Sequence, residues 1–147
     1  MTEHAKLAGE LFAEKGYNCA QAVACAFAEE TGIPEETLRA LSSSFGGGMG
    51  RLREVCGALT GAFMILGIRY GGYDTTDTQA KADHYARVQK LAAQFREECG
   101  SIFCRDIQPN PSTDPVPEER TQEYYKRRPC RAYVELAAEL LDRWEEA

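Results

Sequence analysis

The sequence lacks the short motifs that identify most cysteine chemistry. It has no Cys-x-x-Cys pair, and neither of its two histidines, His4 and His84, has a cysteine at a zinc-finger spacing. The patterns Gly-x-Ser-x-Gly and His-Glu-x-x-His are also missing. These absences argue against a zinc finger, a thioredoxin-like protein, a c-type haem protein and the hydrolases that such motifs mark.

Long apolar runs are missing as well. The longest nearly uncharged stretch, residues 55–68, has 14 residues, whereas a membrane-spanning helix needs about 20. The first residues show no basic segment followed by an apolar run, so we expect no signal peptide and a cytoplasmic protein that does not span a membrane. In a reducing compartment, its six cysteines are metal ligands or redox thiols more often than structural disulfides.

An excess of positive charge is also absent. The chain has 23 acidic and 17 basic residues, a net charge of -6, which argues against a nucleic-acid partner. Residues 126–131 are a local exception, because they place four cations around Cys130. This segment is either a solvated basic patch or a group of charges that lowers the pKa of Cys130 or receives an anionic partner.

The patterns that are present are helical. Apolar spacing, capping residues and glycine stops predict an all-α fold, an irregular bundle of about six to seven helices in one domain over residues 1–147. Its centre is expected to be an apolar helix at about 52–70. The other helices are expected at 3–15, 19–31, 34–43, 77–98, 102–107 and 129–146, and prolines predict a surface loop at about 108–120.

Four cysteines fall where a helix is expected to begin: Cys19, Cys56, Cys104 and Cys130. Free N–H groups at a helix start stabilise an anion, so we expect lowered thiol pKa values and thiolates that serve as metal ligands or redox nucleophiles. Cys25 and Cys99 lie elsewhere on their helices and are expected to be small packed thiols. Cys99 is close enough to Cys104 in sequence to act as a reserve ligand.

The glycines near Cys56 have two interpretations. Gly57 and Gly61 leave room for a bound cluster to approach, or they let two helices pack closely. The glycine run at 46–50 has neither the Lys-Ser/Thr of a P-loop nor a preceding strand. We therefore expect a close-packed turn there in preference to a nucleotide site.

Five segments together resemble the C_GCAxxG_C_C family, small cysteine-rich proteins to which a redox role is ascribed. They are GYNCAQA at 16–22, FGGGMGR at 45–51, CGALTG at 56–61, GSIFC at 100–104 and PC at 129–130. The resemblance implies a mainly helical redox or metal-cluster protein whose hallmark cysteines are Cys19, Cys56, Cys104 and Cys130. Arg53 stands where a smaller residue is expected, which would make the approach to Cys56 more cationic.

Three functions remain open at this point. In the first, the four cysteines bind an iron–sulfur cluster, or zinc, for electron transfer or sensing with an unknown redox partner. In the second, the protein is a thiol-disulfide oxidoreductase or redox sensor, with Cys130 as the attacking thiol. In the third, it is a helical interaction module that forms a homodimer through Gly57 and Gly61.

Overall fold

The computed structural model describes residues 1–127 and 129–146, and the side chains of all of these except 126 and 127. This part of the chain contains helices and no strand, so the predicted all-α class is confirmed. A single antiparallel bridge joins Val55 to Phe103. The helices are α1 (Glu3–Glu14), α2 (Cys19–Ala26), α3 (Ala28–Thr31), α4 (Glu35–Ser42), η1 (Ser43–Phe45), α5 (Gly46–Met49), α6 (Gly57–Tyr70), α7 (Thr78–Cys99), α8 (Cys104–Ile107), α9 (Gln122–Arg127) and α10 (Cys130–Asp142).

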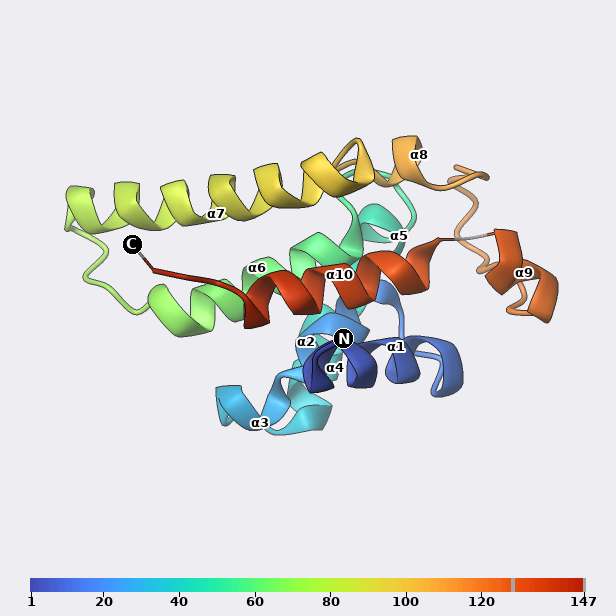
Figure 1. The fold of residues 1–147 in the computed structure, drawn as a ribbon, viewed down its shortest axis with the longest axis horizontal. Coiled ribbons are helices and arrows are strands. Elements are labelled where there is room, and N and C mark those ends of the chain that lie inside the picture. Colours follow the sequence, from blue (N-terminus) through green and yellow to red (C-terminus); the bar gives the residue numbers. More distant parts are fainter. Residues whose placement is uncertain (128, 147) are drawn as a thin grey trace.

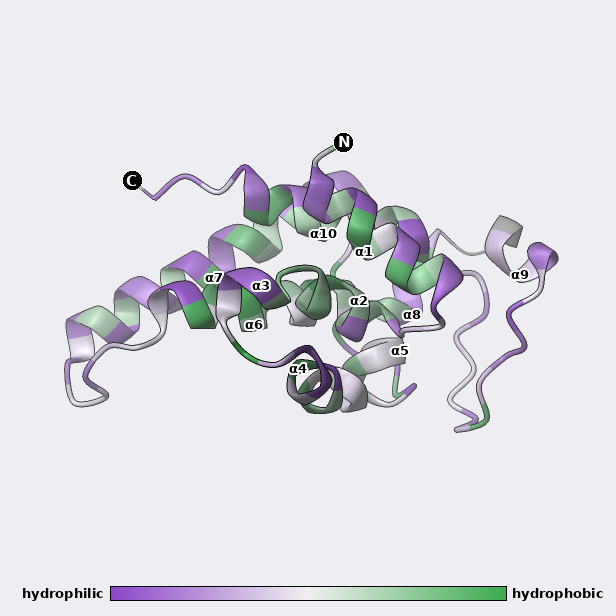
Figure 2. Ribbon diagram, turned by 90° about the horizontal axis from the view of Figure 1, so that it is seen from below, coloured by the Kyte–Doolittle hydropathy of each residue, from purple (hydrophilic) through white to green (hydrophobic). Residues whose placement is uncertain are grey.

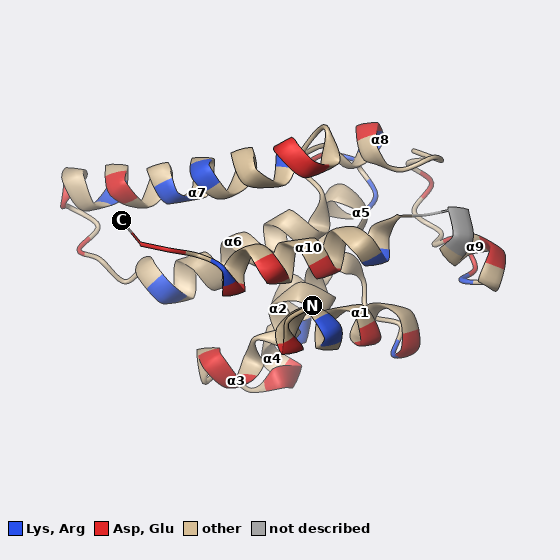
Figure 3. Ribbon diagram, viewed as in Figure 1, with Lys and Arg blue, Asp and Glu red and all other residues tan. Residues whose placement is uncertain are grey.

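Helix α6 packs against α2, α10 and α7, and α10 also packs along α1 (Figure 1). Eight residues of α6, from Gly57 to Leu66, are buried. Figure 2 shows α2 coloured as hydrophobic over most of its length, in contrast to the hydrophilic segment that leads to α9. In Figure 3, α2 and most of α6 lack charged residues, whereas α1 and α3 carry acidic ones. None of the helices in the described chain has the length and apolar character needed to cross a membrane.

The N-terminal helices begin and end at the residues that the sequence indicates. Thr2 caps α1 by accepting the N–H of Ala5. Asn18 and Gln21 form a reciprocal capping box at the start of α2. The single helix expected over 19–31 is interrupted, however, because the chain bends at Phe27. The bend buries the Phe27 ring, which stacks on His4 with centroids 4.1 Å apart.

The helix expected at 52–70 begins later, at Gly57. Arg51 and Arg53 have φ values of 69° and 62°, which are incompatible with a right-handed helix. Residue 55 forms the bridge to Phe103, and the N–H of Cys56 donates to the carbonyl of Ile102 at 2.8 Å. Backbone pairing with residues 102–103 therefore replaces the first turn of the helix that we expected to begin at residue 52.

The C-terminal half follows the expected pattern with two differences. Helix α7 is capped by Asp77 and buries Leu91, Ala92 and Phe95, but Tyr85, which we placed on the apolar stripe, is exposed. Helix α9 was not expected; it forms in the basic segment after the prolines, where the hydroxyl of Thr121 accepts the N–H of Tyr124. Residues 108–121 contain no helix or strand.

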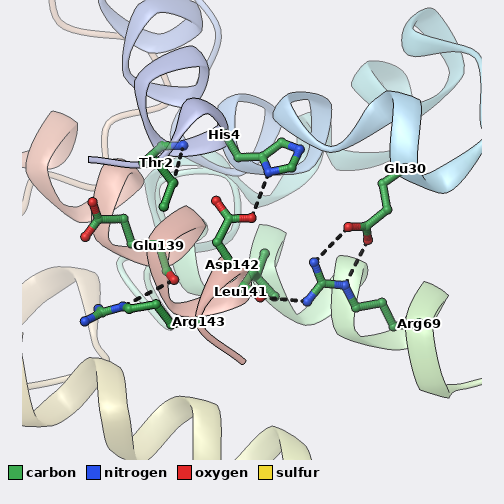
Figure 4. Close-up of polar contacts among 9 residues, drawn as sticks. Thr2, His4, Glu30, Arg69, Glu139, Leu141, Asp142 and Arg143 are labelled. Carbon is green, nitrogen blue, oxygen red and sulfur yellow. Dashed lines mark hydrogen bonds and ion pairs between the residues drawn. The ribbon is translucent and has the colours of Figure 1, made fainter. Parts of the chain in front are cut away.

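Polar side-chain contacts link α1 to α10, and α6 to α3 and α10 (Figure 4). His4 on α1 contacts Asp142 on α10, with Nδ1 and Oδ1 2.7 Å apart. Arg69, near the end of α6, donates to both carboxylate oxygens of Glu30 on α3 and to the carbonyl of Leu141. These contacts join the start of α1 to the end of α10, and the end of α6 to α3 and to the last turn of α10.

Candidate cysteine site

Each of the four cysteines singled out by the sequence lies at the beginning of a helix. Cys19, Cys104 and Cys130 are the first residues of α2, α8 and α10, and Cys56 directly precedes α6. The four helices are far apart in sequence, and sequence spacing alone could not show whether their starts meet.

The starts do meet, around one cavity of about 450 Å³. All four cysteines line this cavity, and Cys25 and Cys99 do not. The other lining residues are Phe12, Gly16, Asn18, Gln21, Gly46, Gly47, Arg51, Arg53, Gly57, Pro117, Glu118, Arg120 and Tyr124. The fold therefore gathers the predicted set of thiols and separates it from the other two.

Glycines allow the close approach around Cys19. A Cβ at Gly57 would lie 2.5 Å from Cys19 Sγ and 2.7 Å from the carbonyl oxygen of Phe45. A Cβ at Gly61 would lie 2.7 Å from the carbonyl oxygen of Ala20. Gly61 therefore serves the contact between α2 and α6, whereas Gly57 both serves that contact and borders the cavity.

Cys56 and Cys104 are held together by backbone pairing between their segments. The N–H of Cys104 donates to the carbonyl of Glu54 at 2.7 Å, next to the Val55–Phe103 bridge. Gly48 packs directly against Cys104, because a Cβ at position 48 would lie 2.7 Å from the Cβ of Cys104. The glycine run is thus a close-packed turn, with φ values of 69° at Gly47 and 70° at Gly48.

Arg53 enters the cavity from the same loop. Its side chain is 4 % exposed, its Nε donates to the carbonyl of Ser112 at 2.8 Å, and its Nη1 lies 3.5 Å from Cys104 Sγ. Its Nη2 is buried and has no hydrogen-bond partner among the residues that the structure describes. We expected this charge near Cys56; its contact is with Cys104 instead.

The expectation of lowered thiol pKa values is wrong for two of the four cysteines. Burial raises the pKa of Cys19 despite the opposing N–H of Gly47, and the thiol of Cys104 raises it further. Burial also raises the pKa of Cys56 well above its ordinary value, and Cys19 adds to this shift. Desolvation of an anion in a closed site outweighs the field of one helix start. Burial therefore favours the neutral form of these two thiols.

Sequence comparison matches residues 17–144 to a family described as "Putative redox-active protein (C_GCAxxG_C_C)". The chain belongs to the C_GCAxxG_C_C family. Comparison with curated proteins and with solved structures gives no match. The matched span includes the four cysteines of the cavity.

The two other cysteines of this C_GCAxxG_C_C protein lie away from the cavity. Burial, followed by the charge of Glu35, raises the pKa of Cys25 to about 12. Burial raises the pKa of Cys99 to about 11, with a smaller effect from Glu98. Both behave as packed thiols, because burial is the main cause of each shift.

One prediction about the site falls outside the described residues, and one residue of the site was not predicted. The basic cluster expected to act on Cys130 consists largely of residues 126–128, whose side chains are outside the described part of the chain. Arg120 was missed: it donates to the carbonyl of Phe12 at 2.8 Å, lies over the Phe12 ring and lines the cavity. No local pattern marks an arginine in an irregular segment for such a contact.

Within residues 1–127 and 129–146, no three His, Cys, Asp or Glu side chains are grouped so that they could hold one ion. A zinc ion needs its sulfur ligands at about 2.3 Å. The cysteines of an iron–sulfur cluster bind separate iron atoms and therefore surround a larger volume. The four cavity cysteines line a space of about 450 Å³ in common.

Proposed function

We propose that Cys19, Cys56, Cys104 and Cys130 form the redox centre of this protein and hold an iron–sulfur cluster for electron transfer or redox sensing. The observation that carries the proposal is the convergence of four helix starts on one cavity, with a cysteine at each start. Membership of a family described as redox-active agrees with it.

The composition of the cavity wall supports the same chemistry. Four thiols suit both [2Fe–2S] and [4Fe–4S] clusters, and such a cluster supplies one-electron transfer when bound. Neither histidine of the chain lines the cavity, and Glu118 is its only carboxylate among the described residues. Soft sulfur ligands that outnumber the single carboxylate favour iron–sulfur clusters, with zinc as the main competitor.

The chain contributes more than ligands. The raised pKa values of Cys19 and Cys56 keep these thiols neutral in the empty site, so their protons must leave when metal binds. Asn18 and its capping box orient Cys19, and the Glu54–Cys104 hydrogen bond orients the pair Cys56 and Cys104.

The proposal is tested by anaerobic purification, with iron, zinc and sulfide measured on one sample beside its absorption spectrum. We expect iron and sulfide in stoichiometric amounts, lost in Cys56→Ser and Cys104→Ser. Cys25→Ser and Cys99→Ser are matched controls outside the cavity and should retain both. Stoichiometric zinc without sulfide would contradict the cluster and indicate a structural ion.

A second candidate is disulfide chemistry between thiols of the same cavity. The observation that favours it is that Cys19 and Cys56 lie close enough for one thiol to raise the pKa of the other. In this case a metal-free protein would form one cavity disulfide on mild oxidation, releasing two electrons and two protons to the oxidant. Non-reducing peptide mapping of the metal-free protein identifies such a pair.

A further inference from the structure

Arg53 carries a buried positive charge that lacks a matching negative one. Its partners are the carbonyl of Ser112 and the sulfur of Cys104, and within the described part of the chain no carboxylate forms an ion pair with it. Removing a charge from water costs several kcal/mol unless it is paired and fully hydrogen-bonded. The structure meets only part of that requirement, because Nη2 remains unpartnered.

The backbone at this position is also strained. Arg53 has a φ of 62°, a conformation that non-glycine residues rarely adopt. This turn brings the guanidinium to the cavity wall, where it borders the same space as the four cysteines. Local strain and a buried charge together point to a ligand that uses the free Nη2.

We propose that Arg53 is the anion-binding residue of the cavity and stabilises the negatively charged centre formed by the four cysteines. The inference rests on the proposed function. Four thiolates carry more negative charge than a cluster core offsets, so the loaded site is an anion. Arg53 provides a charge-assisted donor to Cys104 through Nη1 and a second one to the centre through Nη2.

A consequence for the reduction potential follows. Reduction by one electron adds one negative charge to the site and changes no other bond. A fixed cation beside the site stabilises the reduced form more than the oxidised form, and hydrogen bonds to sulfur act in the same direction. Arg53 is therefore a positioning and tuning residue that raises the potential of the centre.

The test compares Arg53→Asn with Arg53→Lys in the loaded protein. Asparagine tolerates a positive φ better than most residues, so this replacement removes the charge with little added backbone strain. Arg105→Gln is a matched control: Arg105 directly follows Cys104 but does not line the cavity, and its half-exposed side chain pairs with Glu54, with Nη1 and Oε2 3.2 Å apart.

Midpoint potentials are measured by anaerobic titration with dithionite as the electron donor. For Arg53→Asn we expect the reduced form to lose about tenfold in relative stability, a shift of about 59 mV to more negative values for a one-electron couple. The midpoint potential of Arg53→Lys should lie between those of Arg53→Asn and the wild type, since one ammonium cannot maintain both contacts. Arg105→Gln should change the ratio of reduced to oxidised protein by less than about twofold, because solvent screens this half-exposed charge.

The outcomes separate the two proposals. A wild-type protein without iron and sulfide contradicts the proposed function and, with it, this inference. A loaded Arg53→Asn protein with an unchanged potential contradicts the inference alone and leaves Arg53 a purely structural link to Ser112. If Arg53→Asn does not fold, Arg53→Lys decides the matter, since an unchanged potential there also contradicts the role of the guanidinium.

Discussion

Gly57 lies against the sulfur of Cys19 so closely that no side chain fits between them. A Cβ at position 57 would lie 2.5 Å from Cys19 Sγ and 2.7 Å from the backbone oxygen of Phe45. The added atom could not move away from the sulfur without meeting this oxygen. The first turn of α6 and the first residue of α2 are thus in direct contact at the cavity wall.

We expect Gly57→Ala to lower the free energy of unfolding by about 1–3 kcal/mol, because the added methyl group forces α2 and α6 apart. It should also reduce the amount of cluster retained. Urea unfolding of the metal-free protein measures the first effect, and iron content measures the second.

Gly67→Ala is the control for helix propensity in the same helix. Nothing lies within 4 Å of a Cβ at position 67, so alanine there should stabilise the protein by about 0.5–1 kcal/mol. If both substitutions stabilised the protein equally, the close contact between Gly57 and Cys19 would be wrong.

The raised thiol pKa values predict a loss of stability at alkaline pH in the reduced, metal-free protein. Burial raises the pKa of Cys19 and Cys56 in the folded state, so the folded chain holds these protons more tightly than the unfolded chain. Their contribution to stability is therefore complete below the unfolded pKa of about 8.5 and declines as pH rises above it. The slope should approach about 1.4 kcal/mol per pH unit for each such thiol.

Urea unfolding under reducing conditions, repeated from neutral to alkaline pH, measures this slope. Cys56→Ala removes one of the titrating groups and should flatten the decline. A slope that is unchanged in this variant would show that Cys56 is not buried as a neutral thiol.

Local signals predicted where the helices begin and end, because capping is a property of neighbouring residues. Asn18 caps α2 and Asp77 caps α7, each through its own side chain. Helix starts in turn identified the four cysteines before any tertiary contact was known. The error at 52–56 arose because pairing with residues 102–104 is a long-range contact that no local pattern indicates.

The electrostatics of the site could not be predicted in the same way. A helix start lowers a thiol pKa, but the burial that reverses this effect at Cys19 and Cys56 depends on the whole cavity wall. Likewise, the sequence shows Arg53 near Cys56, and only the fold shows that its guanidinium lies against Cys104.

The central claim is that the four cavity cysteines act as one metal-binding unit. Alkylation of each cysteine, followed by mass spectrometry before and after iron chelation at roughly pH 9, tests it most directly. We expect chelation to raise the labelling rate of Cys19, Cys56, Cys104 and Cys130 alike, with Cys19 and Cys56 the slower because burial raises their pKa, while Cys25 and Cys99 react at the same rate in both samples. Four cysteines that respond independently, or that are indifferent to chelation, would contradict a shared centre.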